Sequence, residues 1–261
     1  QWVIQRNIEA EEKWAQKRDG QERRTRRNNS LTMNSIDKVK SISVWIFIIP
    51  FLSVNICLLI VTNYHQILEP GVPIFPTFPY LDGGVSISRT VRYYPLYLIF
   101  KPAMFITSYL LIIYWLNTKK IIHHFNKDYN NTKKIIFFGV GSAILLTLHS
   151  IFLGIKFDND FYKLFRRVIM LSFIIFELIA QAYLIKFFYE IKKELDGFIN
   201  EIYLKIKRVL ITTLIIVSII ILPFLPFDNL KFLKHALEWN VFLGVIIFYL
   251  LTHLMWKKNI K

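Results

Sequence analysis

An acidic residue near the start of a long apolar stretch is the first place in this chain where chemistry is expected. The stretch KHALEWNVFLGVIIFYLLTHLMWKK (234–258) contains Glu238, with Trp239 next to it and His235 three residues earlier. At ~1.5 Å per helical residue, positions 236–256 are long enough to cross the ~30 Å hydrocarbon layer of a bilayer. A carboxylate there costs a few kcal/mol unless it is paired, protonated or faces a polar cavity. Glu238 is therefore the leading candidate functional residue.

Further ionisable residues lie in or beside other apolar stretches, and two interpretations are open. In the first, they form structural pairs, such as Glu238 with Lys101 or Glu177 with His149, which remove most of the burial cost; Arg166 and Arg167 would then be interfacial anchors. In the second, the cations bind the phosphate of a lipid head group and Glu238 orients its hydroxyl or amine. The candidates for this lipid site are Ser88, Arg89, Thr90, Arg92, Lys101, Arg166, Arg167, Glu177, Glu238 and Trp239.

Catalysis is the alternative use of the same residues. Glu238, His235 and His149 are the candidates for acid, base or ligand roles in a lipid hydrolase. The chain has no HExxH pattern and no second clustered His pair within a span, so no metal site is predicted. It also lacks a Walker motif, a dinucleotide fingerprint and a nucleophile elbow around Ser86 and Ser88, so no cofactor is predicted.

The composition identifies an integral membrane protein. Of 261 residues, 54% are hydrophobic and 16% aromatic, which is too apolar for an ordinary soluble domain. The formal charge of +15 falls mainly between the apolar spans, which favours topology and anionic lipid over nucleic acid as its cause. The single cysteine, Cys57, lies in an apolar run and predicts packing.

Six helical spans are predicted, which makes the fold class all-α, a polytopic transmembrane six-helix bundle. The expected spans are 44–63, 96–116, 135–155, 168–189, 209–225 and 236–256. Residues 1–40 are basic and lack an apolar period, which predicts a disordered tail, with a native start near Met33. The loop 64–95, rich in proline and glycine, is a candidate surface for a protein partner.

Lysine and arginine counts predict that both termini are cytoplasmic. The connections 117–134 and 190–208 and the C-terminal tail carry thirteen of these residues, and the alternate connections carry eight. Asn130-Asn131-Thr132 is a glycosylation sequon in a predicted cytoplasmic connection, so it should stay unmodified.

Two stretches, HALEWNVFLGVIIFYLLTH and FPYLDGGVSISRTVRYYP, resemble segments of the damage-regulated autophagy modulator (DRAM) family and its Frag/Sfk-type relatives. The helix HALEWNVFLGVIIFYLLTH resembles that family's last span, where an acid followed by an aromatic residue precedes an FYLLT-like run. The loop FPYLDGGVSISRTVRYYP is similar to one carrying an IS-x-T element, matched by Ile87, Ser88 and Thr90, with Arg89 where the family often has Asp and without the Gly that often follows. The resemblance implies a multi-pass protein of endomembranes (lysosome, Golgi or ER) or of the plasma membrane. The family's branches are associated with autophagy, phosphoinositide kinase recruitment and remodelling of GPI-anchor lipid.

Three functions follow as hypotheses. The leading one is a non-catalytic protein that binds or organises membrane lipids, in autophagy or membrane-lipid regulation. The second is an enzyme that remodels a GPI anchor or glycerolipid, and the third is a carrier of protons or small ions.

Overall fold

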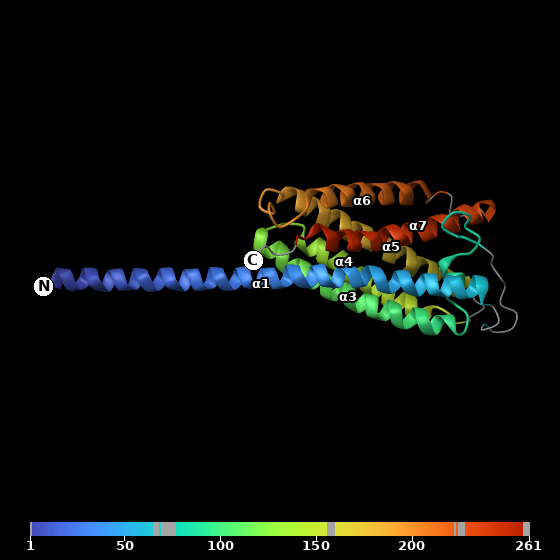
Figure 1. Ribbon diagram of the computed structural model, residues 1–261, viewed down its shortest axis with the longest axis horizontal. Helices are drawn as coiled ribbons and strands as arrows, with labels where there is room; N and C mark the ends of the chain where they lie inside the picture. Colours follow the sequence, from blue (N-terminus) through green and yellow to red (C-terminus); the bar gives the residue numbers. More distant parts are fainter. Residues whose placement is uncertain are drawn as a thin grey trace.

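The chain forms a bundle of long helices from which the first helix extends far beyond the others (Figure 1). The computed structural model describes the backbone of residues 2–64, 68, 77–155, 160–221, 223 and 228–257. Side chains are described over the same ranges from residue 32 onward, except at positions 160, 163 and 228, and also at Arg18 and Asp19.

The elements are helices throughout the described residues, with one isolated bridge between Ile199 and Trp256. Their bounds are α1 Trp2–Asn63, α2 Ile87–Thr90, α3 Leu96–Phe125, α4 Thr132–Phe152, α5 Asp160–Glu190, α6 Glu201–Ile221, the 3-10 turn η3 Asp228–Leu230, and α7 Lys231–Met255.

Five helices are long and apolar enough to cross a membrane within the described part of the chain. They are Thr32–Asn63 of α1, α3, α4, Leu164–Glu190 of α5, and α7. The remaining long helix, α6, carries Lys205, Lys207 and Arg208 within its first eight residues, and this charge separates it from the other five. The predicted fifth span, 209–225, extends beyond α6 into residues outside the described ranges. The chain is thus an all-helical, multi-pass membrane protein.

The helix α1 begins well before the apolar residues. The sequence predicts a disordered tail over residues 1–40, whereas the backbone is helical from Trp2 and continuous with the first span. Within that segment Ser35, Ile36 and Val39 are buried, so α1 contacts the bundle before its apolar run begins. Residues of high helix propensity, such as the Ala, Glu, Gln, Lys and Arg of this segment, permit the extension. Pro50 lies inside the helix without ending it.

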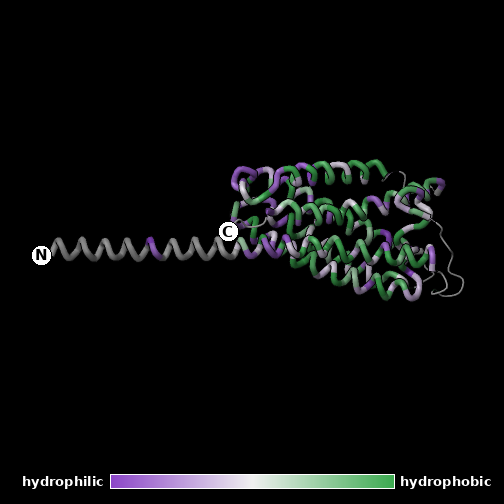
Figure 2. Tube along the Cα trace, in the orientation of Figure 1, coloured by the Kyte–Doolittle hydropathy of each residue, from purple (hydrophilic) through white to green (hydrophobic). Residues whose placement is uncertain are grey.

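The helices carry apolar residues both in the interior of the bundle and on its outer surface. The main contacts join α1 to α3 and α7, α4 to α3 and α5, and α6 to α7. Gly139 of α4 lies so close to α3 that a Cβ there would sit 2.3 Å from a ring atom of Trp115, so the absence of a side chain permits this helix contact. Large apolar side chains such as Phe137 and Val209 are 65% and 66% exposed, which suits lipid rather than water. Figure 2 shows that hydrophobic residues predominate along the helices of the bundle.

The two ends of the bundle can be told apart by their contacts. At one end, which we call the loop end, the connection 77–95 packs on the start of α7. At the other end, the last residues of α7 meet the α5–α6 connection, through hydrogen bonds between Asn200 and Met255 and between Lys257 and Phe198. There, too, His253 Nδ1 lies 2.8 Å from the carbonyl of Lys40 in α1. Helices α1 and α7 are therefore antiparallel.

Candidate functional site

The connection 77–95 forms a cap over the first turns of α7. Trp239 Nε1 donates to the carbonyl of Val85 at 2.8 Å, and Asn240 donates to the carbonyl of Tyr80 at 2.8 Å. His235 Nδ1 lies 3.0 Å from the carbonyl of Gly83. Gly83 has a φ of +63°, and a Cβ there would lie 1.7 Å from the backbone oxygen of Phe232, so only glycine allows this approach. We call residues 77–95 the cap.

A carboxylate turn gives the cap its shape. Asp82 accepts hydrogen bonds from the backbone N–H of Phe78 and of Gly84, both at 2.8 Å, and from the hydroxyl of Thr77. These bonds, led by that of Thr77, lower the pKa of Asp82. Further along, the side chain of Ser86 accepts from the N–H of Arg89 and begins the single turn of α2.

The carboxyl group of Glu238 lies beneath α2. Its Oε1 is buried and has no hydrogen-bond partner among the described residues, although the side chain as a whole is partly exposed. The carboxyl faces the backbone N–H groups of Ile87 and Ser88. The pairing of Glu238 with Lys101 that the sequence suggested does not form. Lys101 instead donates to the carbonyl of Ile151 at 3.3 Å and lies 5.7 Å from the ring centroid of Tyr97.

Several cations gather beside the cap. Arg92 Nε donates to the carbonyl of Ser88 at 3.2 Å. Burial lowers the pKa of Arg92, and repulsion by Arg166 and Arg89 adds to this effect. Arg166 also lies close enough to His149 to act on it electrostatically. Its guanidinium carbon is 5.9 Å from the ring centroid of Tyr162, and its buried Nε has no hydrogen-bond partner among the described residues. We call Arg89, Arg92 and Arg166 the arginine cluster.

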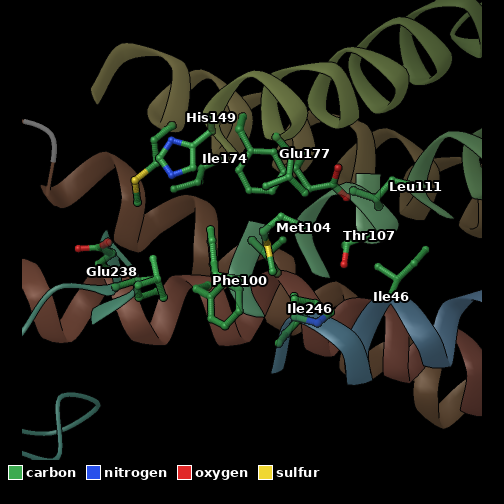
Figure 3. A pocket seen from close by; sticks show the side chains of 18 of the residues that line it. Ile46, Phe100, Met104, Thr107, Leu111, His149, Ile174, Glu177, Glu238 and Ile246 are labelled. Atoms are coloured by element: carbon green, nitrogen blue, oxygen red, sulfur yellow. The ribbon is translucent and has the colours of Figure 1, made fainter. Parts of the chain in front are cut away.

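A partly enclosed cavity lies between the cap and the middle of the bundle. Its empty space is about 830 Å³, including its open side. The side chains around it are mostly apolar, and Figure 3 shows Glu238 and His149 toward one end and Glu177, Thr107 and Leu111 toward the other. Nδ1 of His149 is buried without a partner among the described residues. The cavity thus has a polar end near the cap and the arginine cluster.

Glu177 is fully buried in the middle of the bundle and holds three helices together. Its Oε2 lies 2.5 Å from Ser142 Oγ on α4, and its Oε1 accepts from Gln181 Nε2 of its own helix at 2.8 Å. Oε1 also accepts from the hydroxyl of Tyr249 on α7. Glu177 and Gln181 are four residues apart and therefore share one face of α5. The pairing of Glu177 with His149 that the sequence suggested is replaced by the bonds to Ser142 and Tyr249.

A buried lysine is the polar feature that sequence reasoning missed. Lys207 of α6 is fully buried, donates to Thr252 Oγ1 at 2.8 Å and lies 3.9 Å from the ring centroid of Phe248. The sequence KIKR (205–208) before an apolar run indicates that the helix reaches the membrane interface there. Nothing in this pattern therefore predicted that Lys207 is buried. The partial helical period, which places Leu204, Lys207 and Ile211 on one face, was the available clue.

The remaining predicted residues have separate places. Thr90 is buried and its hydroxyl donates to the carbonyl of Ser86 at 3.1 Å, and Trp239 is buried against the cap, so both are structural. Ser88 lines the cavity, and Arg167 is exposed. His235 contacts the cap and is absent from the cavity lining. Among the described residues, no three His, Cys, Asp or Glu side chains are grouped so as to hold a metal ion.

Comparisons with known proteins give no relative. No family model, no curated protein and no solved structure matches the chain.

Proposed function

We propose that this chain is a non-catalytic multi-pass membrane protein that binds a lipid. An acyl chain occupies the cavity, and an anionic head group lies beside the arginine cluster. The single observation that supports this proposal is the cavity, whose lining is mostly apolar and which has Glu238 and His149 toward the end near the cap. The acid toward its other end, Glu177, is hydrogen-bonded to Ser142, Gln181 and Tyr249, so the unpartnered Glu238 Oε1 and His149 Nδ1 are left for a head group.

The cavity suits an acyl chain by its lining. Ligand sites in proteins are lined mainly by apolar side chains with a few polar groups that fix orientation. Phe100, Met104, Leu146 and Phe173 supply such a lining between helices that lie at membrane depth. Because the cavity is open on one side, a lipid can enter it without unfolding the bundle.

The arginine cluster supports an anionic head group. Guanidinium groups bind phosphate oxygens with short, charge-assisted hydrogen bonds. Among the described residues, no carboxylate forms an ion pair with Arg92 or Arg166. The buried Oε1 of Glu238 is an acceptor without a donor among the described residues, and a hydroxyl or amine of the head group supplies that donor.

We also propose six crossings with both termini in the cytoplasm. Because α1 and α7 are antiparallel and the chain passes through α3, α4, α5 and α6 between them, α6 completes an even number of crossings. The excess of Lys and Arg at the end opposite the cap then places that end in the cytoplasm. Asn130 should stay free of glycan when the chain is expressed in a secretory pathway. A glycan on Asn130 would show that the orientation is the reverse of the one proposed.

The resemblance to the DRAM family and its relatives stays a prediction. Its two motifs fall on the parts that carry the proposed site, since the IS-x-T element forms α2 and the acid of the last span faces it. A role in autophagy or membrane-lipid regulation, at an endomembrane or the plasma membrane, is the physiological setting that we propose from this resemblance.

Thermal stabilisation by defined lipids tests lipid binding. The full chain is purified, reconstituted in nanodiscs of phosphatidylcholine, and compared with nanodiscs that contain phosphatidic acid with the same acyl chains. We expect phosphatidic acid to raise the Tm, and the double variant Arg92→Gln/Arg166→Gln to lose this increase. Arg208→Gln is the matched control, because Arg208 lies on α6 over Tyr189 and should not alter the increase.

Filling the cavity tests the place of the acyl chain. Ile174 lines the cavity, and its neighbour Ile175 is 40% exposed on the outside of α5. Ile174→Trp should reduce binding of a fluorescent phosphatidic acid, and Ile175→Trp should leave it unchanged. Equal binding by both variants and the wild type would place the lipid outside the cavity and overturn the proposal.

A lipid-remodelling enzyme is the second candidate, favoured by one observation. Glu238 Oε1 and His149 Nδ1 are both buried, unpartnered among the described residues and on the lining of one cavity. An acid and a base so placed suit proton transfer to a bound lipid. Incubation of the purified chain with phosphatidic acid or a GPI lipid, followed by mass spectrometry, should detect a product that Glu238→Gln no longer forms. Unchanged lipid after prolonged incubation excludes this candidate for the lipids tested.

A further inference from the structure

Glu177 is the buried ionisable residue that the proposed lipid site does not use. Its side chain is buried at the edge of the cavity, and its two oxygens contact Ser142 on α4, Gln181 on α5 and Tyr249 on α7. No lysine or arginine is among these partners. A negative charge at membrane depth with no cation beside it is costly.

The number of hydrogen atoms available to these contacts indicates whether Glu177 is protonated. Ser142 Oγ lies 2.8 Å from the carbonyl oxygen of Gly139 and 2.5 Å from Glu177 Oε2. A serine hydroxyl has one hydrogen and can donate to only one of these oxygens. If Glu177 is ionised, the other contact brings two acceptors together without a proton between them.

A protonated Glu177 satisfies every contact at once. Its Oε2–H donates to Ser142, and Ser142 then donates to the carbonyl of Gly139. The bare Oε1 accepts from Gln181 and from Tyr249. Each of these contacts then has one donor and one acceptor, as buried hydrogen bonds require, and Gln181 Oε1 stays without a partner among the described residues.

The surrounding elements contain few groups that could share the proton. From α7, Tyr249 contacts the carboxyl, and Glu238 lies on the lining of the same cavity. From α3, the hydroxyl of Tyr114 is buried with no hydrogen bond among the described residues, and its ring is 4.9 Å from that of Tyr249. From α4, His149 lines the cavity, whereas the α1 and α2 residues on its lining carry no ionisable side chain. Lys207 of α6 contacts Thr252, one helical turn beyond Tyr249.

The cavity gives the acid a route for exchange. Glu177 lies on its lining, and the same space continues to His149 and Glu238 at the end near the cap (Figure 3). We propose that Glu177 is a proton-binding site in the membrane-embedded core, protonated in the arrangement described here, which exchanges its proton through the cavity. Loss of the proton would turn the Ser142 hydroxyl toward the carboxylate and release its bond to the carbonyl of Gly139 within α4. The protonation state therefore sets the direction of the hydrogen bond between α4 and α5, whether or not a lipid is bound.

Infrared spectroscopy of the full chain in phosphatidylcholine nanodiscs tests this proposal. At neutral pH we expect the absorption of a protonated carboxylic acid, which Glu177→Gln removes. Glu190→Gln is the matched control on the same helix, because Glu190 is exposed beside Lys186 and should not affect the band. Absence of the band at neutral pH, or a band that Glu238→Gln removes and Glu177→Gln leaves, would overturn the proposal.

A second measurement needs no variant at Glu177. Dicyclohexylcarbodiimide is an apolar reagent that modifies protonated carboxyl groups in apolar surroundings, and mass spectrometry identifies the modified residue. Glu177 should be modified in the wild type, less so at alkaline pH. Ile174→Trp should slow the modification by filling the cavity, and Ile175→Trp should not. Modification restricted to other acids would contradict the proposal, and it would leave lipid binding untouched.

Discussion

The two acids on the cavity lining, Glu177 and Glu238, differ in what surrounds them. Glu177 is enclosed by donors and acceptors from three helices, so its hydrogen-bonding capacity is filled by the protein. Glu238 lies beneath a cap of irregular structure, and its Oε1 is buried without a partner among the described residues. The first acid is built into the packing of the bundle. The second keeps hydrogen-bonding capacity that none of the described residues fills, which is what the proposed binding of a lipid head group requires.

Alanine substitutions should give the largest difference between the two acids. Glu177→Ala leaves Tyr249 without its acceptor, leaves Gln181 Nε2 with only the carbonyl of Val245 at 3.4 Å, and creates a void, so we expect the free energy of unfolding to fall by about 3 kcal/mol or more. Glu238→Ala removes a group with one unpartnered oxygen and should cost about 1 kcal/mol or less. Reversible denaturation in mixed micelles measures both. Equal losses would show that Glu238 has partners as strong as those of Glu177.

The cap can be separated from the helices by its glycine. Gly83→Ala forces a Cβ against the backbone of Phe232 and requires a positive φ, so we expect a loss of about 2 kcal/mol beyond that of its control. Gly197→Ala is the control, because Gly197 also has a positive φ, +83°, but has open space around its Cβ position. Thermal unfolding of the two variants isolates the close approach of cap and helix. If Gly83→Ala lost no more stability than Gly197→Ala, the close contact between the cap and α7 would contribute nothing to the free energy of unfolding.

Substitution of Lys207 should raise stability, whereas the preceding substitutions should lower it. Its ammonium has one hydrogen bond and a ring contact to offset the loss of water, and removal of such a buried charge in favour of an apolar chain is often stabilising. We expect Lys207→Met to raise the free energy of unfolding by about 1 kcal/mol. Lys205→Met, on an exposed position of the same helix, should have little effect. Marked destabilisation by Lys207→Met alone would show that the charge itself holds α6 to α7.

The sequence could predict the helices much better than the contacts between them. Long apolar runs indicate spans because backbone groups in a bilayer must be satisfied internally, and the start of α3 and the ends of α5 and α7 lie within one residue of the predicted bounds. The predicted end of α3 at 116 was wrong, because the helix continues to Phe125. The partner of Glu177 was not predictable, because Tyr249 is 72 residues away and the meeting depends on how α5 and α7 are rotated. The Glu177–Gln181 pair was predictable, because four residues of one helix fix the geometry. The helical segment before Met33 was missed because its charges indicate disorder as readily as a solvated helix.

The smallest expected effect concerns acid and the cap. The hydrogen bonds to Asp82 hold its pKa below the ordinary value of 3.8, so the folded state favours the ionised form. The stabilisation is therefore complete above the ordinary pKa and is lost as the pH falls through the lower, folded value. Asp82→Asn should lower the Tm slightly at neutral pH and reduce the further loss on acidification, because the group that titrates is gone. Asp37→Asn, an exposed change on α1, should retain the full acid dependence of the wild type. If the Tm of Asp82→Asn and of the wild type fell equally on acidification, the fall would come from the buried acids. Protonation of Asp82 would then have no effect on the stability of the cap.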